Sequence, residues 1–278
     1  MTGAVPARSL REVMALEAAG ADRFVEVVPA PMPSPRLFGG FVAGQCVRAA
    51  ALTVEDARRP HSFHAYFVRA GETGRRVELT VDRVRTGRSF ATRRVTATQG
   101  DSLIAVADVS FQALEDGEEV QVASPTDVAP PGEVPGRHRL TGGMWSEVFD
   151  VLPAKAPPDG LPIAMHPCWV RLRVPLGDDP VLQACAQVVI ADMGMLGSSR
   201  NWSRDRDYTG SSLDHAVWMH RLVGTDGWLL LSSSAVSYFG GRGLVHGHIH
   251  DQAGTLLASM SQEGLMRGTG AVVAGAGR

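Results

Sequence analysis

Residues 61–69, HSFHAYFVR, and residues 212–221, SLDHAVWMHR, decide the fold of this chain. Both stretches carry a His-Ala pair, His64-Ala65 in the first and His215-Ala216 in the second, 151 positions apart. Each stretch is followed by further strand-like runs and by a Gly-Arg step. A duplicated unit of this size indicates two similar folded halves that share one core.

The elements around these stretches occur in the same order in both halves. The first half has an apolar helix and four strand-like runs, at 38–54, 61–69, 75–86, 88–99 and 102–112. The second has a strand, a helix and four runs, at 166–174, 180–196, 212–222, 227–238, 242–251 and 255–266. We therefore predict an α+β fold in which an antiparallel sheet wraps each helix and the two sheets join edge to edge, which removes two exposed edges.

The composition of the segments between these elements predicts the domain boundaries. Residues 1–121 form the first repeat, which begins with a short helix that Ser9 caps and Gly20 ends. Residues 122–160 are rich in Pro and Gly and are interpreted as a connector. The second repeat is expected over 161–267, and 268–278 is expected to be a flexible tail.

The net charge, the cysteine count and the length of the apolar runs exclude several classes of protein. The chain has 278 residues and a net charge of -2, which provides no overall field for nucleic acid or for an anionic membrane. Its three cysteines show no CxxC spacing, which favours a reducing compartment. No signal-peptide pattern and no uninterrupted apolar run of membrane-spanning length are found, so we expect a cytoplasmic protein.

A comparison of the two copies at the 151-residue spacing points to three polar residues in the second half. They fall opposite apolar or aromatic residues of the first: Asp192 on Phe41, Ser212 on His61, and Gln262 on Phe111. Asp192 stands in an apolar helix, where a carboxylate costs several kcal/mol unless it is hydrogen-bonded or faces water. The three residues are either a structural polar network or a group that holds one water, with Asp192 as the base.

At these residues the chain resembles the acyl-CoA thioesterase II family, the double-hotdog thioesterases. The resemblance extends from Leu37 to Arg267 and rests on LFGGFVAGQ (37–45), PHSFHAYFVRAG (60–71), VDRVRTGRSFATRRV (81–95), VSFQ (109–112), ADM (191–193), SLDHAVWMHR (212–221) and SQEGLMR (261–267). It implies two hotdog folds in one chain and hydrolysis of acyl-CoA, or of an acyl-carrier thioester. It also implies a homodimer or larger homo-oligomer and no cofactor.

The resemblance assigns roles to the same three residues. The family's Asp, Thr and Gln, which bind the attacking water, fall on Asp192, Ser212 and Gln262. Serine keeps the hydroxyl that threonine supplies. Phe41 stands where the family has Gln after the two glycines, Gly39 and Gly40, so the pocket is expected to differ there. The residues Gly39, Gly40, Phe41, His61 and Phe111 are expected to line the substrate site.

Arginines of the first half are candidates for binding the phosphates of coenzyme A. The stretch 81–95 holds five of them, of which Arg88 and Arg93 are the chosen candidates. Guanidinium groups suit phosphate. The alternative interpretation is a set of solvated strand faces.

The sequence offers three other interpretations. His246, His248 and His250 share a strand face, but no carboxylate pattern accompanies them, so no metal site is expected. A hydratase or dehydratase on the same fold would use a His near the Asp, such as His61, but Gly197 occupies the position five residues after Asp192 where hydratases have His. A non-catalytic acyl-thioester binding protein is the other alternative, because Phe41 departs from the family pattern.

Overall fold

The protein is described from a computed structural model that covers residues 7–27, 34–55, 57–121, 127–133, 145–155, 167–199, 206–222 and 225–272. Its helices are α1 (Leu10–Val13), α2 (Gly39–Ala51), α3 (Pro180–Ala191) and α4 (Met195–Ser199). Its strands are β1 (Leu16–Gly20), β2 (Arg23–Glu26), β3 (Arg59–Phe67), β4 (Glu78–Thr86), β5 (Phe90–Gln99), β6 (Ser102–Gln112), β7 (Phe149–Pro153), β8 (Cys168–Leu172), β9 (Arg206–Ser212), β10 (Asp214–Met219), β11 (Leu229–Phe239), β12 (Arg242–His250) and β13 (Leu256–Val272).

All the strands belong to one sheet, whose order repeats outward from a central joint. The order is β1-β2-β4-β5-β6-β3-β10-β13-β12-β11-β8-β7, and β9 pairs with β13 beside this path. β3 and β10 form the joint and run antiparallel, with His64 opposite Ala216 and Ala65 opposite His215. Counted from the joint, the first half has the order β3-β6-β5-β4 and the second half has the matching order β10-β13-β12-β11. The two halves are therefore related by an approximate twofold axis. The predicted α+β fold with sheets joined edge to edge is confirmed.

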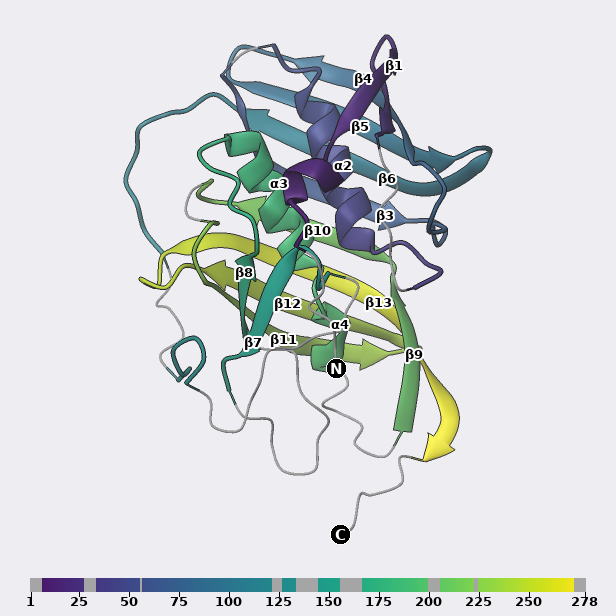
Figure 1. Ribbon diagram of the computed structural model, residues 1–278, viewed down its shortest axis with the longest axis vertical. Helices are drawn as coiled ribbons and strands as arrows, with labels where there is room; N and C mark the ends of the chain where they lie inside the picture. The colour runs from purple at the N-terminus through teal and green to yellow at the C-terminus, as the bar shows by residue number, and fades with distance from the viewer. Residues whose placement is uncertain are drawn as a thin grey trace.

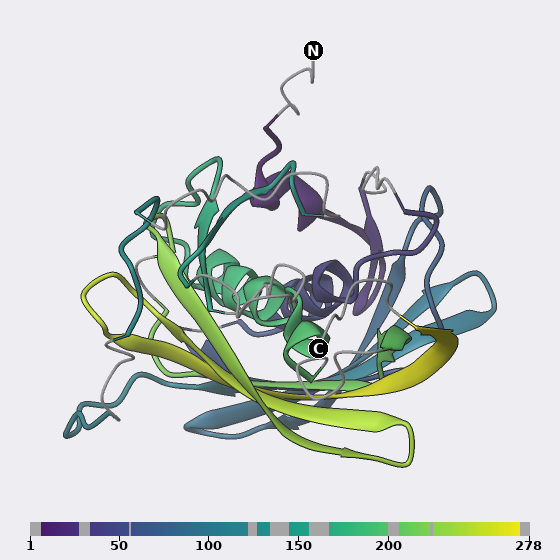
Figure 2. The same cartoon turned by 90° about the horizontal axis from the view of Figure 1, so that it is seen from below.

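The sheet curves around α2 and α3, which lie side by side within it (Figures 1 and 2). The two helices are antiparallel, because the start of α2 meets the end of α3. A Cβ built on Gly40 would lie 2.9 Å from the Val189 carbonyl oxygen, and one on Gly44 would lie 2.8 Å from Val189 Cγ2. Glycine at these two positions, one helical turn apart, therefore allows the helices to approach closely.

The expected boundaries differ from the structure in several places. The N-terminal helix is only four residues long, and Gly20, with φ of 137°, ends strand β1 rather than a helix. Strand β7 forms inside the segment 122–160 that was predicted to be a connector, because it pairs with β8. Residues 268–272 are not a free tail, since β13 extends to Val272 and pairs with β9; residues 273–278 lie outside the described residues.

The 151-residue correspondence between the halves is wrong for α2 and α3 and for β3 and β10. Phe41 lies in the first turn of α2, whereas Asp192 caps the far end of α3. His64 is exposed on the outer face of the sheet, whereas His215 is fully buried on the inner face. Strands place alternate residues on opposite faces, so a shift of one residue from the true correspondence exchanges the faces, as it does between β3 and β10. In the last strands the spacing keeps the face, because Phe111 on β6 and Gln262 on β13 are both buried.

Residues 180–197 are apolar enough to resemble a membrane-crossing segment, yet most of them are buried inside the protein. They comprise α3, a turn at Asp192–Gly194 and part of α4 rather than one helix. Their apolar character therefore fits a core helix enclosed by its sheet. The cytoplasmic location stays a prediction.

Candidate active site

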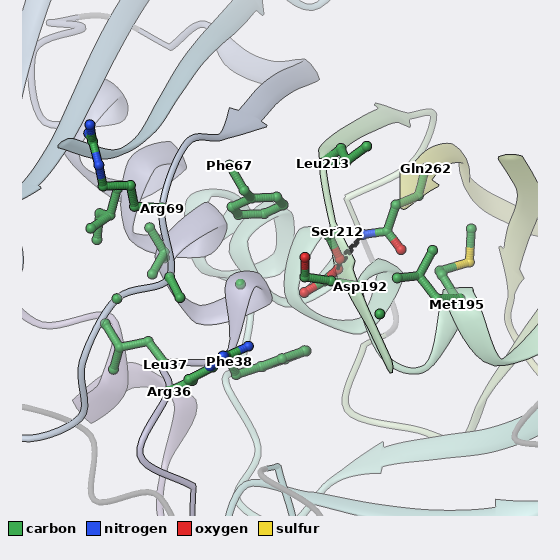
Figure 3. A pocket seen from close by; sticks show the side chains of 18 of the residues that line it. Arg36, Leu37, Phe38, Phe67, Arg69, Asp192, Met195, Ser212, Leu213 and Gln262 are labelled. Carbon is green, nitrogen blue, oxygen red and sulfur yellow. Dashed lines mark hydrogen bonds between the residues drawn. The ribbon is translucent and has the colours of Figure 1, made fainter. Parts of the chain in front are cut away.

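A cavity of about 630 Å³ opens where the start of α2 meets the end of α3. The segment before α2, the end of β3, the turn into α4 and the end of β9 supply its walls. In Figure 3, Asp192 and Phe67 occupy the middle, with Arg36, Leu37 and Arg69 on one side and Met195 and Gln262 on the other. The cavity therefore lies across the joint between the two halves, and both halves line it.

Asp192, Ser212 and Gln262 meet at the centre of this cavity. The Gln262 amide Nε2 donates to Asp192 Oδ1 at 2.5 Å and to Ser212 Oγ at 3.0 Å. The Ser212 hydroxyl donates to Asp192 Oδ1 at 3.4 Å, a long contact of the kind common at unliganded sites. The end of α3, the end of β9 and the middle of β13 hold these side chains, so all three come from the second half.

The environment of Asp192 suits a proton acceptor that works near neutral pH. The residue is only 7% exposed. Burial raises the pKa of its carboxyl to about 6, although hydrogen bonds from Gln262, the Gly40 N–H and Ser212 act in the opposite direction. A carboxyl with this pKa is ionised at pH 7 and yet far more basic than an exposed one.

The start of α2 faces the cavity and has no side-chain cap from its own N-cap residue. Phe38 is its N-cap and makes no capping hydrogen bond through its side chain. Gly40 N–H donates to Asp192, and Gly39 lines the cavity beside it. The start of α3 differs, because Asp179 accepts from Val181 N and Leu182 N. Of the two central helices, only α2 can therefore offer its positive end to a ligand here.

Three expected lining residues lie elsewhere. Phe41 is buried behind Phe38, with the two rings edge to face at 5.3 Å, so it supports the cavity wall without forming it. His61 lies six residues before Phe67 on β3 and bonds Ser110 Oγ at 2.8 Å. Phe111 is 1% exposed in the core. These three residues do not line the cavity, contrary to the prediction. Gly39 does line it, whereas Gly40 is buried and reaches the site only through its N–H, which donates to Asp192.

The predicted phosphate-binding arginines are also misplaced. Arg93 is 1% exposed, and its guanidinium donates to Thr53 Oγ1, Thr53 O, Thr86 Oγ1, and the carbonyls of Arg85 and Thr92. It joins the end of α2 to β4 and β5 and is closed to ligand. Arg88 is exposed in the β4–β5 turn and does not line the cavity.

Arg93→Ala should therefore reduce stability rather than substrate affinity. Loss of a buried guanidinium with several hydrogen bonds is expected to lower the free energy of unfolding by about 2–4 kcal/mol. Urea denaturation measures this loss, and the KM of the folded fraction for acyl-CoA should stay within about twofold of the wild-type value. A raised KM at unchanged stability would return Arg93 to the substrate site.

The rim of the cavity holds two arginines that sequence reasoning passed over. Arg36 and Arg69 both line it, and both are exposed. Within the described ranges neither side chain forms an ion pair, and the Arg69 guanidinium makes one long hydrogen bond, of 3.4 Å, to Leu103 O. Arg69 is the last residue of the stretch HSFHAYFVR. Its place directly after the strand at the joint could have indicated that it lies near the site.

The histidines of β12 form no metal centre in the described part of the chain. His246 Nδ1 bonds the Ser261 hydroxyl at 2.8 Å. The rings of His248 and His250 are 6.0 Å apart, and His250 is buried. Among the described residues no group of three or more His, Cys, Asp or Glu side chains is placed to hold a metal ion.

Comparison with known proteins identifies the family. The sequence profile of the acyl-CoA thioesterase N-terminal domain matches residues 28–112, and that of the C-terminal domain matches residues 122–266. Human acyl-coenzyme A thioesterase 8 is 32% identical over 262 residues, which cover 85% of this chain and 82% of the relative. Acyl-CoA thioesterase 2 of Haemophilus influenzae is 28% identical, covering 84% and 88%.

A solved structure gives the same answer. The acyl-CoA thioesterase II TesB2 of Mycobacterium marinum superposes with a TM-score of 0.77 at 36% identity, over 94% of this chain and 98% of that one. The expected hotdog fold is confirmed by its solved neighbours, and the two halves of the sheet are consistent with a double hotdog. The chain belongs to the acyl-CoA thioesterase family.

Proposed function

We propose that this protein hydrolyses acyl-CoA thioesters with a water activated by Asp192. The observation that carries the proposal is the meeting of Asp192, Ser212 and Gln262 in a cavity at the start of α2. The water is held by the carboxylate, the hydroxyl and the amide. It attacks the thioester carbonyl carbon while Asp192 takes its proton. The C–S bond then breaks, and the proton passes from Asp192 to the departing thiolate.

The oxyanion of the tetrahedral intermediate is assigned to the start of α2. The Gly40 N–H already donates to Asp192, so the Gly39 N–H and the helix dipole are proposed to stabilise the negative charge. Gly39 has no side chain to obstruct the carbonyl, since a Cβ there would lie 3.1 Å from both Asp192 Oδ2 and Phe67 Cζ. The base comes from one half and the oxyanion donors from the other.

Release of free thiol from a panel of acyl-CoA esters tests this function. A thioesterase releases one thiol for each acid formed. A hydratase or dehydratase of the same fold would change the acyl chain and release none. A non-catalytic binding protein would retain acyl-CoA with no turnover. Absence of thiol release across the panel would reject the proposal.

The pH dependence of kcat/KM should report Asp192. The base must be ionised, and burial raises its pKa to about 6, so kcat/KM should be constant above neutral pH. Below about pH 6 it should fall about tenfold per unit. His215 is fully buried beside α3, and burial lowers its pKa to about 4, so it does not produce this transition. A profile flat down to pH 4.5 would exclude Asp192 as the base.

The arginines on the rim are proposed to bind the phosphates of the thiol carrier. Arg36→Gln combined with Arg69→Gln should raise the KM for acyl-CoA by about tenfold or more, because charge-assisted hydrogen bonds to phosphate are lost. Hydrolysis of the matching acyl-pantetheine, which lacks phosphate, should be unchanged. Arg88→Gln, an exposed arginine outside the cavity, is the matched control. Equal losses on both esters would contradict this assignment.

We also propose that the protein forms a homodimer through the outer face of β3 and β10. Tyr66 is 68% exposed there and Trp218 is 40% exposed, and the rings of His64 and Trp218 stack edge to face at 5.2 Å. Exposed aromatic residues on a sheet face are typical of protein contacts. Sedimentation of the wild type and of Trp218→Ser measures the oligomeric state.

A further inference from the structure

Leu196 forms the cavity wall next to the catalytic trio. It belongs to α4, which begins three residues after Asp192 and follows a turn in which Gly194 has φ of 70°. Leu196 and Met195 both line the cavity. The segment that carries the base therefore also carries an apolar wall.

The position of Leu196 depends on a missing side chain in β13. A Cβ built on Gly264 would lie 2.2 Å from Leu196 Cδ2 and 2.5 Å from Cδ1, so the leucine fills the space that any other residue at 264 would occupy. Gly264 pairs with Ser212 on β9 and lies two residues beyond Gln262 on the same inward face. Because Gly264 lies directly opposite Ser212, the leucine wall stands next to the trio.

The two arms of the cavity differ in chemistry. On one side of Asp192 the lining includes Arg36 and Arg69, and on the other it includes Met195 (Figure 3). Leu196 follows Met195 in α4 and also lines the cavity. Transfer of an alkyl chain from water into the second arm is favourable, whereas the arginines of the first arm suit charged oxygen atoms.

We propose that the acyl chain enters the arm under α4 and ends against Leu196, so that this residue sets the length of acyl group accepted, with a preference for short to medium chains. The proposal rests on the thioesterase function proposed above. Gly264 acts through Leu196, because it fixes how far the leucine stands from the trio.

Opposite changes at this contact should move the chain-length preference in opposite directions. Leu196→Ala removes the wall and lengthens the apolar arm, so kcat/KM should rise for acyl groups longer than the wild-type optimum, about tenfold or more for each methylene newly buried. Gly264→Ala introduces a methyl group where the leucine stands. The flexible end of Leu196 must then move into the cavity, and the optimum should become shorter.

The first arm of the cavity offers a matched control. Leu37 lies against Gly71 in the same way, with Cδ1 2.7 Å from a Cβ built on that glycine. Leu37→Ala and Gly71→Ala therefore repeat both changes in the arm that holds the arginines. They should leave the chain-length optimum where it is.

The experiment measures thiol release from straight-chain esters, acetyl-CoA to palmitoyl-CoA, by the full-length protein and these variants. The double variant Leu196→Ala with Gly264→Ala should behave as Leu196→Ala alone, since the added methyl then has nothing to displace. Leu196→Val gives the same direction of change if the alanine variant does not fold.

Two results would overturn the proposal. One is an optimum that moves with Leu37→Ala and not with Leu196→Ala, which would place the acyl chain in the other arm. The second is a wild-type optimum at palmitoyl-CoA. Failure of the thioesterase function itself would look different, because the wild type would then release no thiol from any ester.

Discussion

Asp192→Asn is expected to lower kcat for acyl-CoA hydrolysis by about 10²–10⁴-fold, the usual contribution of a general base. Asparagine has the size of aspartate and can still accept the hydrogen bond that Gln262 Nε2 donates, but it cannot accept the proton of the water. The substrate should still bind, because the rim arginines and the apolar arm are unchanged. Thiol release under saturating acyl-CoA measures the loss.

Asp108→Asn is the matched control for this substitution. Asp108 lies on the outer face of β6 and forms an ion pair with Arg94 at 2.8 Å. Unlike Asp192, its side chain is partly exposed to solvent. Its replacement should leave kcat unchanged. Near-normal hydrolysis by Asp192→Asn, with its fold verified by circular dichroism, would require another base.

The same substitution should make the protein more stable at alkaline pH. The pKa of Asp192 is about 6 in the folded state, against 3.8 for an unperturbed carboxyl. Between these values the folded state keeps a proton that the unfolded state releases, so stability falls as the pH rises through this window. Above this pH window, the ionised buried carboxylate lowers the free energy of unfolding by about 3 kcal/mol. A neutral asparagine can restore up to this full amount.

Urea denaturation at pH 8 and at pH 4 measures this difference. Asp192→Asn should exceed the wild type by up to about 3 kcal/mol at pH 8, and the advantage should shrink toward zero at pH 4. The exposed pair at Asp108 should change stability by less than about 1 kcal/mol when Asp108→Asn is made. If Asp192→Asn were less stable at pH 8, the hydrogen bonds to the carboxylate would outweigh the effect of burial.

The sequence predicted the trio by a comparison that the structure only partly supports. Asp192, Ser212 and Gln262 do lie together, and their polarity in apolar surroundings was sufficient to indicate them. Phe41 and His61 do not correspond to Asp192 and Ser212, because the second half has α4 and β9 inserted between its helix and β10. A repeated motif fixes the order of strands well, but it does not fix which face a residue occupies.

The arginines show a second limit of sequence reasoning. Arg93 and Arg36 cannot be distinguished by charge or by local pattern. Arg93 is nevertheless buried and hydrogen-bonded at the end of α2, whereas Arg36 is exposed on the cavity rim. The Leu196–Gly264 contact is likewise invisible in the sequence, since the two residues lie on separate elements. Such facts depend on how distant segments pack.

The hydrogen bond from Gly40 N–H to Asp192 has a consequence for how the protein evolved and how it can be engineered. This hydrogen bond connects a backbone group of the first half to the base of the second. The two halves of the chain therefore contribute different parts of one site. The first half is free to lose every polar side chain of its own, provided that it keeps the bare, close-fitting helix start. Expressed apart, neither half would hold both the proton acceptor and the donors that face it.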